Sequence, residues 1–102
     1  MFLVRRVFKA KPGQARRAAA IVRRMGKVYE EAGQRSTTRV YLSGGMVPGP
    51  ADTVYIDWTE ESLRIPFRSD NKIPEEISTL GGELREVVEY HYVEFYELLT
   101  DE

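Results

Sequence analysis

The chain has no cysteine and only one histidine among its 102 residues. Disulfide bonds, thiolate catalysis and cysteine-ligated metal sites are therefore excluded. The sequence also lacks a phosphate-binding loop, a dinucleotide-binding glycine motif, histidine-rich metal spacing and a Ser-His-Asp signature. We accordingly expect no metal and no cofactor.

Excess charge of one sign is missing too, since the formal net charge is −1. A nucleic-acid-binding surface normally needs clustered lysine and arginine in excess, so we expect no nucleic-acid partner. No apolar run approaches the roughly 18 residues of a membrane span. The opening sequence MFLVRRVFKA has neither the long apolar stretch nor the small-residue cleavage site of a signal peptide. We expect a cytoplasmic protein with no membrane partner.

What is present is typical of a soluble globular protein, with 42% hydrophobic and 30% charged residues. We expect a single domain over residues 1–102. A chain of this length buries roughly 60–70% of the surface that its unfolded form exposes. A hydrophobic sheet face must therefore be covered by helices or by a second subunit.

The apolar pattern predicts the order strand–helix–strand–strand–helix–strand. A period of two predicts a strand over 2–9, and a period near 3.6 predicts a helix over 14–32. Pro12 is expected in the first turn of this helix and Gly33 just after its end. Gly26 is expected to weaken the helix by about 1 kcal/mol relative to alanine.

The second half of the chain continues the pattern. Strands are predicted over 34–43 and 52–58, joined by an irregular connection over 44–51. Thr59 is predicted as the N-cap of a short helix that ends at Pro66. Residues 67–72 are expected to form a loop.

Pro74 is predicted to open the second main helix, which the Gly81-Gly82 pair is expected to weaken or break. Its apolar stripe is Ile77, Leu80, Leu84 and Val87 or Val88. The last strand is predicted over 88–99, longer than its neighbours, with a loose tail over 100–102.

Because side chains alternate along a strand, each strand divides into two sets. The aliphatic sets, including Val54, Ile56 and Trp58, are expected to face the helices, and Val93 and Phe95 with them. The other face is expected to carry Arg39, Tyr41, Tyr55, Asp57, Tyr90, Tyr92 and Tyr96, joined by Arg5 or Arg6. That face is too aromatic for water and too polar for an ordinary core, so we expect a second copy of the chain to cover it.

Three features carry a family resemblance: the strand–KPG–helix opening, the glycine-bearing loop after the second strand, and VYIDWTEESL over 54–63. They resemble the dimeric α+β-barrel superfamily, in particular its antibiotic-biosynthesis-monooxygenase-like and NIPSNAP-like branches. The resemblance implies an α+β, ferredoxin-like βαββαβ protomer with a four-stranded antiparallel sheet. Two such sheets would meet as a homodimer to close a barrel, with the helices outside.

Asp57 with Arg39, Tyr41 and Tyr55 is the candidate catalytic set. A desolvated carboxylate can take a proton from a phenol or a β-dicarbonyl, and the resemblance to cofactor-independent monooxygenases implies that the carbanion then reacts with oxygen. The candidate ligand-binding residues are Tyr90, Tyr92 and Tyr96. Alternatively, Asp57 and Arg39 are cross-strand partners and the tyrosines pack a dimer interface.

The single histidine, His91, alternates to the helix side with Val93 and Phe95. In haem-degrading relatives the ligand histidine comes from a helix, and the predicted helices here contain none, so we expect no haem. Trp58 is predicted in the core. The basic residues of the first helix are predicted to form a solvated face: Arg16, Arg17, Arg23, Arg24 and Lys27.

Three functions remain open, because fold alone does not select one. The protein is an oxygenase acting on a small aromatic or polyketide-like molecule, a non-catalytic binder of a small apolar or aromatic ligand, or a structural homodimer whose barrel is filled. Whether it is an enzyme is not decided by the sequence.

Overall fold

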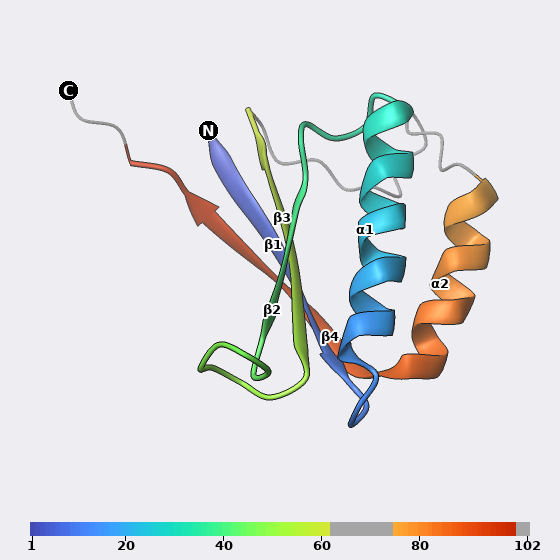
Figure 1. Ribbon diagram of the computed structural model, residues 1–102. Coiled ribbons are helices and arrows are strands. Elements are labelled where there is room, and N and C mark those ends of the chain that lie inside the picture. The colour runs from blue at the N-terminus through green and yellow to red at the C-terminus, as the bar shows by residue number, and fades with distance from the viewer. Residues whose placement is uncertain (62–74, 100–102) are drawn as a thin grey trace.

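The computed structural model describes residues 1–61 and 75–99, which form one sheet and two helices. The sheet is antiparallel, has the strand order β2-β3-β1-β4, and carries both helices on one face (Figure 1). The predicted α+β, ferredoxin-like βαββαβ fold is confirmed. The elements in chain order are β1 (Phe2–Ala10), α1 (Ala15–Glu31), β2 (Arg39–Ser43), β3 (Thr53–Glu60), α2 (Glu75–Val87) and β4 (Val88–Glu97).

The main core lies between the sheet and the helices. In the register of β1 and β3, Val4 lies opposite Trp58 and Phe8 opposite Val54, so these side chains share the helix side of the sheet. Both helices contribute apolar stripes, as their periodicity predicted. The buried residues of this core are Val4, Phe8, Ala10, Ala18, Ile21, Val22, Val54, Ile56, Trp58, Leu84 and Val87.

Helix α1 starts later than the sequence predicted. Pro12 lies in the turn that precedes α1 and not in its first turn, since the helix begins at Ala15. Gly13 has a φ of 77°, a left-handed conformation that glycine adopts without steric cost. At the other end Gly33 has a φ of 72° and its N–H donates to the Glu30 carbonyl, so glycine ends the helix as predicted.

Gly26 is more than a weak point in α1. It is buried, and a Cβ at this position would lie 2.6 Å from Thr38 Oγ1 and 3.0 Å from Ile56 Cδ1. Only glycine lets α1 approach the sheet this closely.

Three predicted boundaries are wrong, and one of them is the end of the last strand, which is Glu97 and not residue 99. Thr59 does not cap a helix, because Thr59 and Glu60 are the last residues of β3 and pair with Leu3 and Phe2 of β1. The available partner strand outweighs the capping preference of threonine. Strand β2 begins at Arg39 and not at residue 34.

The segment before β2 is held by α1. Its backbone N–H groups find partners there, from Gln34 to the Tyr29 carbonyl and from Thr38 to the Glu30 carboxylate. These bonds keep residues 34–38 out of the sheet. In the other helix, α2 runs unbroken through Gly81 and Gly82.

Some predictions concern residues that lie outside the described ranges. These are the short helix up to Pro66, the loop over 67–72, the placement of Pro74 and the tail over 100–102. Within the described ranges, neither helix is long and apolar enough to cross a membrane.

Candidate functional site

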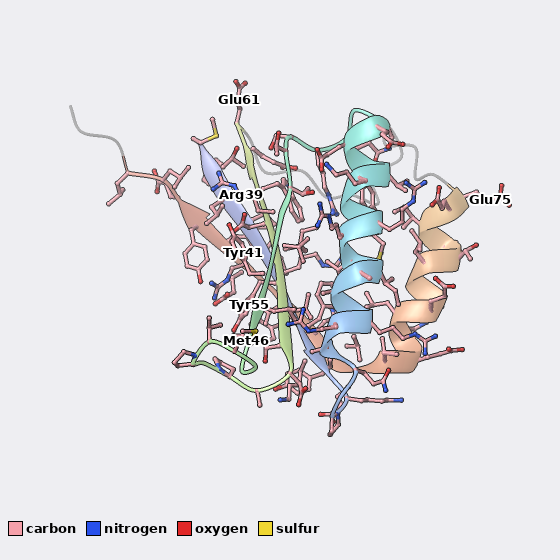
Figure 2. The ribbon with its side chains drawn as sticks, in the orientation of Figure 1. Arg39, Tyr41, Met46, Tyr55, Glu61 and Glu75 are labelled. Atoms are coloured by element: carbon pink, nitrogen blue, oxygen red, sulfur yellow. The ribbon has the colours of Figure 1, made fainter. Side chains whose placement is uncertain are left out.

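The sheet face without helices, which we call the open face, gathers the predicted site residues. Figure 2 shows Arg39, Tyr41 and Tyr55 on the side of the sheet away from α1. The registers place Asp57 beside Arg39 and Arg5, so Arg5 and not Arg6 is the arginine of β1 on this face. The open face consists of Leu3, Arg5, Val7 and Lys9 of β1, Arg39, Tyr41 and Ser43 of β2, Thr53, Tyr55, Asp57 and Thr59 of β3, and Tyr90, Tyr92, Glu94 and Tyr96 of β4.

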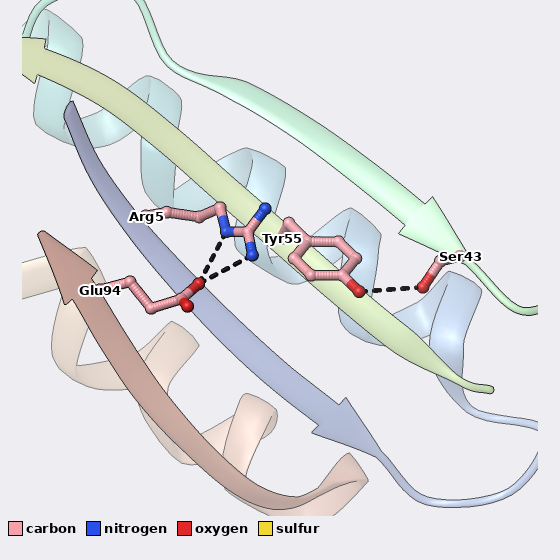
Figure 3. A network of polar contacts seen from close by, with 4 residues as sticks. All are labelled: Arg5, Ser43, Tyr55 and Glu94. Atoms are coloured by element: carbon pink, nitrogen blue, oxygen red, sulfur yellow. Dashed lines mark hydrogen bonds and ion pairs between the residues drawn. The ribbon is translucent and has the colours of Figure 1, made fainter. Parts of the chain in front are cut away.

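Polar contacts cross the open face from β4 to β2 (Figure 3). Arg5 Nη2 lies 2.8 Å from Glu94 Oε1, and its guanidinium carbon lies 5.0 Å from the centre of the Tyr55 ring. The Tyr55 and Ser43 hydroxyl oxygens are 3.1 Å apart. Because Ser43 donates its one proton to the Pro50 carbonyl at 2.8 Å, Tyr55 is the donor to Ser43. Arg5 and Tyr55 are therefore held in place by partners on both outer strands.

The charges at the β4 edge of this row support one another. The hydrogen bond from the Tyr96 hydroxyl is the largest cause that lowers the pKa of Glu94 below its usual range. The hydrogen bond and the charge of the Arg5 guanidinium lower this pKa further. The same Glu94 carboxylate raises the pKa of Tyr96. Burial lowers the pKa of Arg5, but the hydrogen bond and charge of Glu94 outweigh it and the net change is upward. All three groups therefore keep their usual charge state at neutral pH.

The candidate catalytic set is only partly assembled in the single chain. The Tyr41 hydroxyl donates toward Asp57 Oδ1 at 3.5 Å. Arg39 lies opposite Asp57 in the register, but among the described contacts the two form no ion pair. Tyr55 points its hydroxyl to Ser43. The geometry thus brings Tyr41 to Asp57 and leaves Arg39 exposed beside it.

The three tyrosines proposed to bind a ligand form an aromatic strip along β4. Tyr90, Tyr92 and Tyr96 are 56%, 49% and 41% exposed, and Tyr41 at the opposite edge is 43% exposed. Val7, between Tyr55 and Tyr92 in the register, is by contrast only 2% exposed. The open face therefore has a closed centre and aromatic margins that a single chain leaves in water.

Strand β4 is exposed on its other face as well. Val93 and Phe95, on the helix side, are 45% and 54% exposed. His91 lies on this side as predicted, with its ring centre 5.7 Å from that of Phe8. In the described ranges, no group of acidic and histidine side chains could hold a metal ion.

Two arginines on the helix side were not predicted there, because Arg6 was one of two candidates for the open face and Arg35 was not singled out. The Arg35 guanidinium carbon lies 3.8 Å from the centre of the Tyr29 ring and 3.9 Å from that of Trp58. Arg6 lies on the same side of the sheet, within 5.0 Å of the Phe8 ring. The sequence did contain a signal for Arg6, because it is a charged residue on the side of β1 whose other side chains point into the core. Arg35 gave none, because it lies in the connection between α1 and β2.

Comparisons by sequence and by structure give different results. No protein-family model matches the chain, and no curated protein matches it in sequence. Two similar solved structures are a NIPSNAP domain protein from Burkholderia xenovorans (TM-score 0.68, 14% identity, 97% of this chain and 95% of that one) and a NIPSNAP family protein from Agrobacterium tumefaciens (TM-score 0.68, 19% identity, 98% and 93%). A third, also from Agrobacterium tumefaciens, has a TM-score of 0.57 at 17% identity over 95% and 92%. The chain shares the fold of these NIPSNAP proteins, as its sequence features predicted.

Proposed function

We propose that two copies of the chain pack their open faces together and enclose a tyrosine-lined chamber that binds a small aromatic or apolar molecule. The observation that carries the proposal is the aromatic margin of the open face, where Tyr90 and Tyr92 are about half exposed. Large exposed aromatic surfaces mark interaction sites, because leaving them in water is unfavourable.

The polar residues of the open face fit such an interface. Arg5 and Glu94 neutralise each other within one chain, so covering them does not bury an uncompensated charge. Packed sheets lie about 10 Å apart. Side chains from both faces either fill the space between the sheets or leave part of it open as a chamber. The resemblance to dimeric α+β barrels supports the same assembly.

The open edge of β4 gives a further reason for a partner. In the strand order β2-β3-β1-β4, β4 is an edge strand of ten residues whose side chains are exposed on both faces. Long exposed edge strands tend to associate with other chains. A second copy packed on the open face would cover that side of the strand.

Fluorescence titration with 1-naphthol tests the chamber. We expect saturable binding to the native protein and its loss in Tyr90→Arg, which adds a charge next to Lys9 on the open face. The matched control is Thr79→Arg at an exposed position on α2, which should bind 1-naphthol like the native protein. Absence of saturable binding in the native protein would favour a dimer with a filled barrel.

A second function, cofactor-independent oxygenation, is favoured by the contact of Tyr41 with Asp57. Asp57 would take the O–H proton of a phenol or a C–H proton of a β-dicarbonyl, and a ring carbon or the α-carbon of the resulting anion would form a C–O bond with molecular oxygen. The protonated Asp57 would return its proton to the peroxide. Loss of water from the hydroperoxide would leave a carbonyl product, with the substrate carbon oxidised and oxygen reduced.

A further inference from the structure

A cavity of about 300 Å³ lies on the helix side of the sheet, opposite to the open face. It is bounded by the end of α1, by β1 and β3, and by the exposed helix side of β4. We call it the arginine pocket. Its described lining includes Val4, Arg6, Tyr29, Arg35, Trp58 and Phe95.

Arg35 packs against two aromatic rings in this pocket. Its guanidinium carbon lies 3.8 Å from the centre of the Tyr29 ring and 3.9 Å from that of Trp58, so both rings contact the group. The N–H donors of a planar guanidinium lie at its edge. No described residue accepts a hydrogen bond from Arg35. Within the described part of the chain, the N–H groups at the edge of its planar guanidinium can therefore donate to a ligand.

Arg6 adds a second positive charge. It extends from the helix side of β1, between Ile56 and Val93 in the register, and forms no ion pair with a described residue. Burial lowers the pKa of Arg6. Burial also lowers the pKa of Arg35 to about 10, with the charge of Arg6 contributing to the decrease. Both arginines are still cations at neutral pH and repel each other.

One carboxylate faces these two cations. Glu60 Oε1 accepts a hydrogen bond from Trp58 Nε1 at 3.0 Å, and the charge of Glu60 raises the pKa of Arg35. Glu60 is the single Asp or Glu residue of the described lining. Among the described lining residues, two arginines and one carboxylate thus leave an excess of one positive charge, which a monovalent anion would balance.

The wall formed by β4 is apolar. Val93 and Phe95 are 45% and 54% exposed and belong to the lining. The volume is at the lower end of the range for small-molecule sites, which are mostly apolar with a few placed polar groups. A ligand that fits has one charged end and a flat apolar body.

We propose that the arginine pocket binds a small organic monocarboxylate, with its carboxylate on the edge of the Arg35 guanidinium near Arg6 and its apolar body against Val93 and Phe95. Arginine pairs with carboxylates through two parallel N–H···O bonds. Among the described residues, only Tyr92 belongs both to the lining of this pocket and to the open face, and all the described lining comes from a single chain.

Isothermal titration calorimetry with 2-naphthoate, and with 2-naphthamide as the neutral isostere, tests the proposal. We expect one 2-naphthoate per chain and at least about tenfold weaker binding of 2-naphthamide, since hydrogen bonds between two charged groups are stronger than those to a neutral acceptor. Arg35→Met should weaken 2-naphthoate at least about tenfold. Arg17→Met, at an exposed position on α1, should leave it unchanged.

Two further variants keep the test decisive. Phe95→Glu, at an exposed position, should weaken 2-naphthoate more than 2-naphthamide even if Arg35→Met does not fold. Tyr90→Arg should still bind 2-naphthoate, which separates this site from the open-face chamber. Equal binding of the two probes, undiminished binding by folded Arg35→Met, or inorganic phosphate binding as tightly as 2-naphthoate would overturn the proposal.

Discussion

Arg5 and Glu94 form an ion pair across β1 and β4, with 2.8 Å between Arg5 Nη2 and Glu94 Oε1. The pair lies on the open face, and Tyr55 lies under the same guanidinium. It fixes a cation in the middle of an aromatic surface while leaving no net charge there. An interface that covers this pair buries two charges that compensate each other and not a single uncompensated charge.

This pair predicts how acid affects stability. Hydrogen bonds from Tyr96 and Arg5 lower the pKa of Glu94, so its stabilisation is present above the unfolded pKa, near 4.3, and is lost as pH falls through the folded pKa. Denaturant unfolding should show Glu94→Gln less stable than the native protein at pH 6, with the difference shrinking as the pH falls below about 4. Glu89→Gln, an exposed carboxylate of the same strand, should show a smaller difference at pH 6. A Glu94→Gln difference that does not shrink between pH 6 and pH 3 would contradict the assignment.

The two faces of β3 should respond differently to substitution. Ile56 is 2% exposed in the core, and Ile56→Ala should lower the free energy of unfolding by roughly 2–5 kcal/mol. Tyr55→Phe removes only the hydrogen bond to Ser43, which contributes about 0.5–1.5 kcal/mol. Urea unfolding measures both, and the reverse ranking would show that the faces are assigned the wrong way round.

Two glycines in helices should respond in opposite directions. Gly26→Ala improves helix propensity by about 1 kcal/mol, but its Cβ meets Thr38 Oγ1 at 2.6 Å, and overpacking typically costs about 1–3 kcal/mol. We expect a net loss of stability. Gly81→Ala has open space around its Cβ and should gain about 0.5–1 kcal/mol. The midpoint of thermal melting measures the stability of both variants. If Gly26→Ala were more stable than Gly81→Ala, the packing argument would be contradicted.

Asp57 decides between the two candidate functions. If the protein is an oxygenase, Asp57→Asn should lower turnover with a reactive phenol by about 10²–10⁴-fold, because it removes the general base. Its melting temperature should stay within a few degrees of the native value. Oxygen consumption measures turnover, and Thr79→Arg is the control. Early unfolding or failure to dimerise would show instead that Asp57 has a structural role.

Alternation along strands was enough to predict the two faces of the sheet. Because one face must be buried, a strand such as β3 with Val54, Ile56 and Trp58 at every second position permits only one orientation. The open-face positions of Arg39, Tyr41, Tyr55 and Asp57 follow from it.

Features that depend on contacts between distant segments could not be read from the sequence. Thr59 has the local character of an N-cap, but its strand state depends on Leu3 of β1. Gly26 appeared unfavourable because the approach of Thr38 is a tertiary contact. The Arg35 stack joins Tyr29 of α1 to Trp58 of β3, and no local pattern encodes that meeting.

The molar mass in solution tests the central claim most directly. Light scattering during gel filtration at micromolar concentration should give twice the 11.7 kDa of one chain. Tyr90→Arg should shift the mass toward 11.7 kDa, and Thr79→Arg should not. A native protein that elutes as a folded species of 11.7 kDa would contradict the account, because its open face would then remain in water.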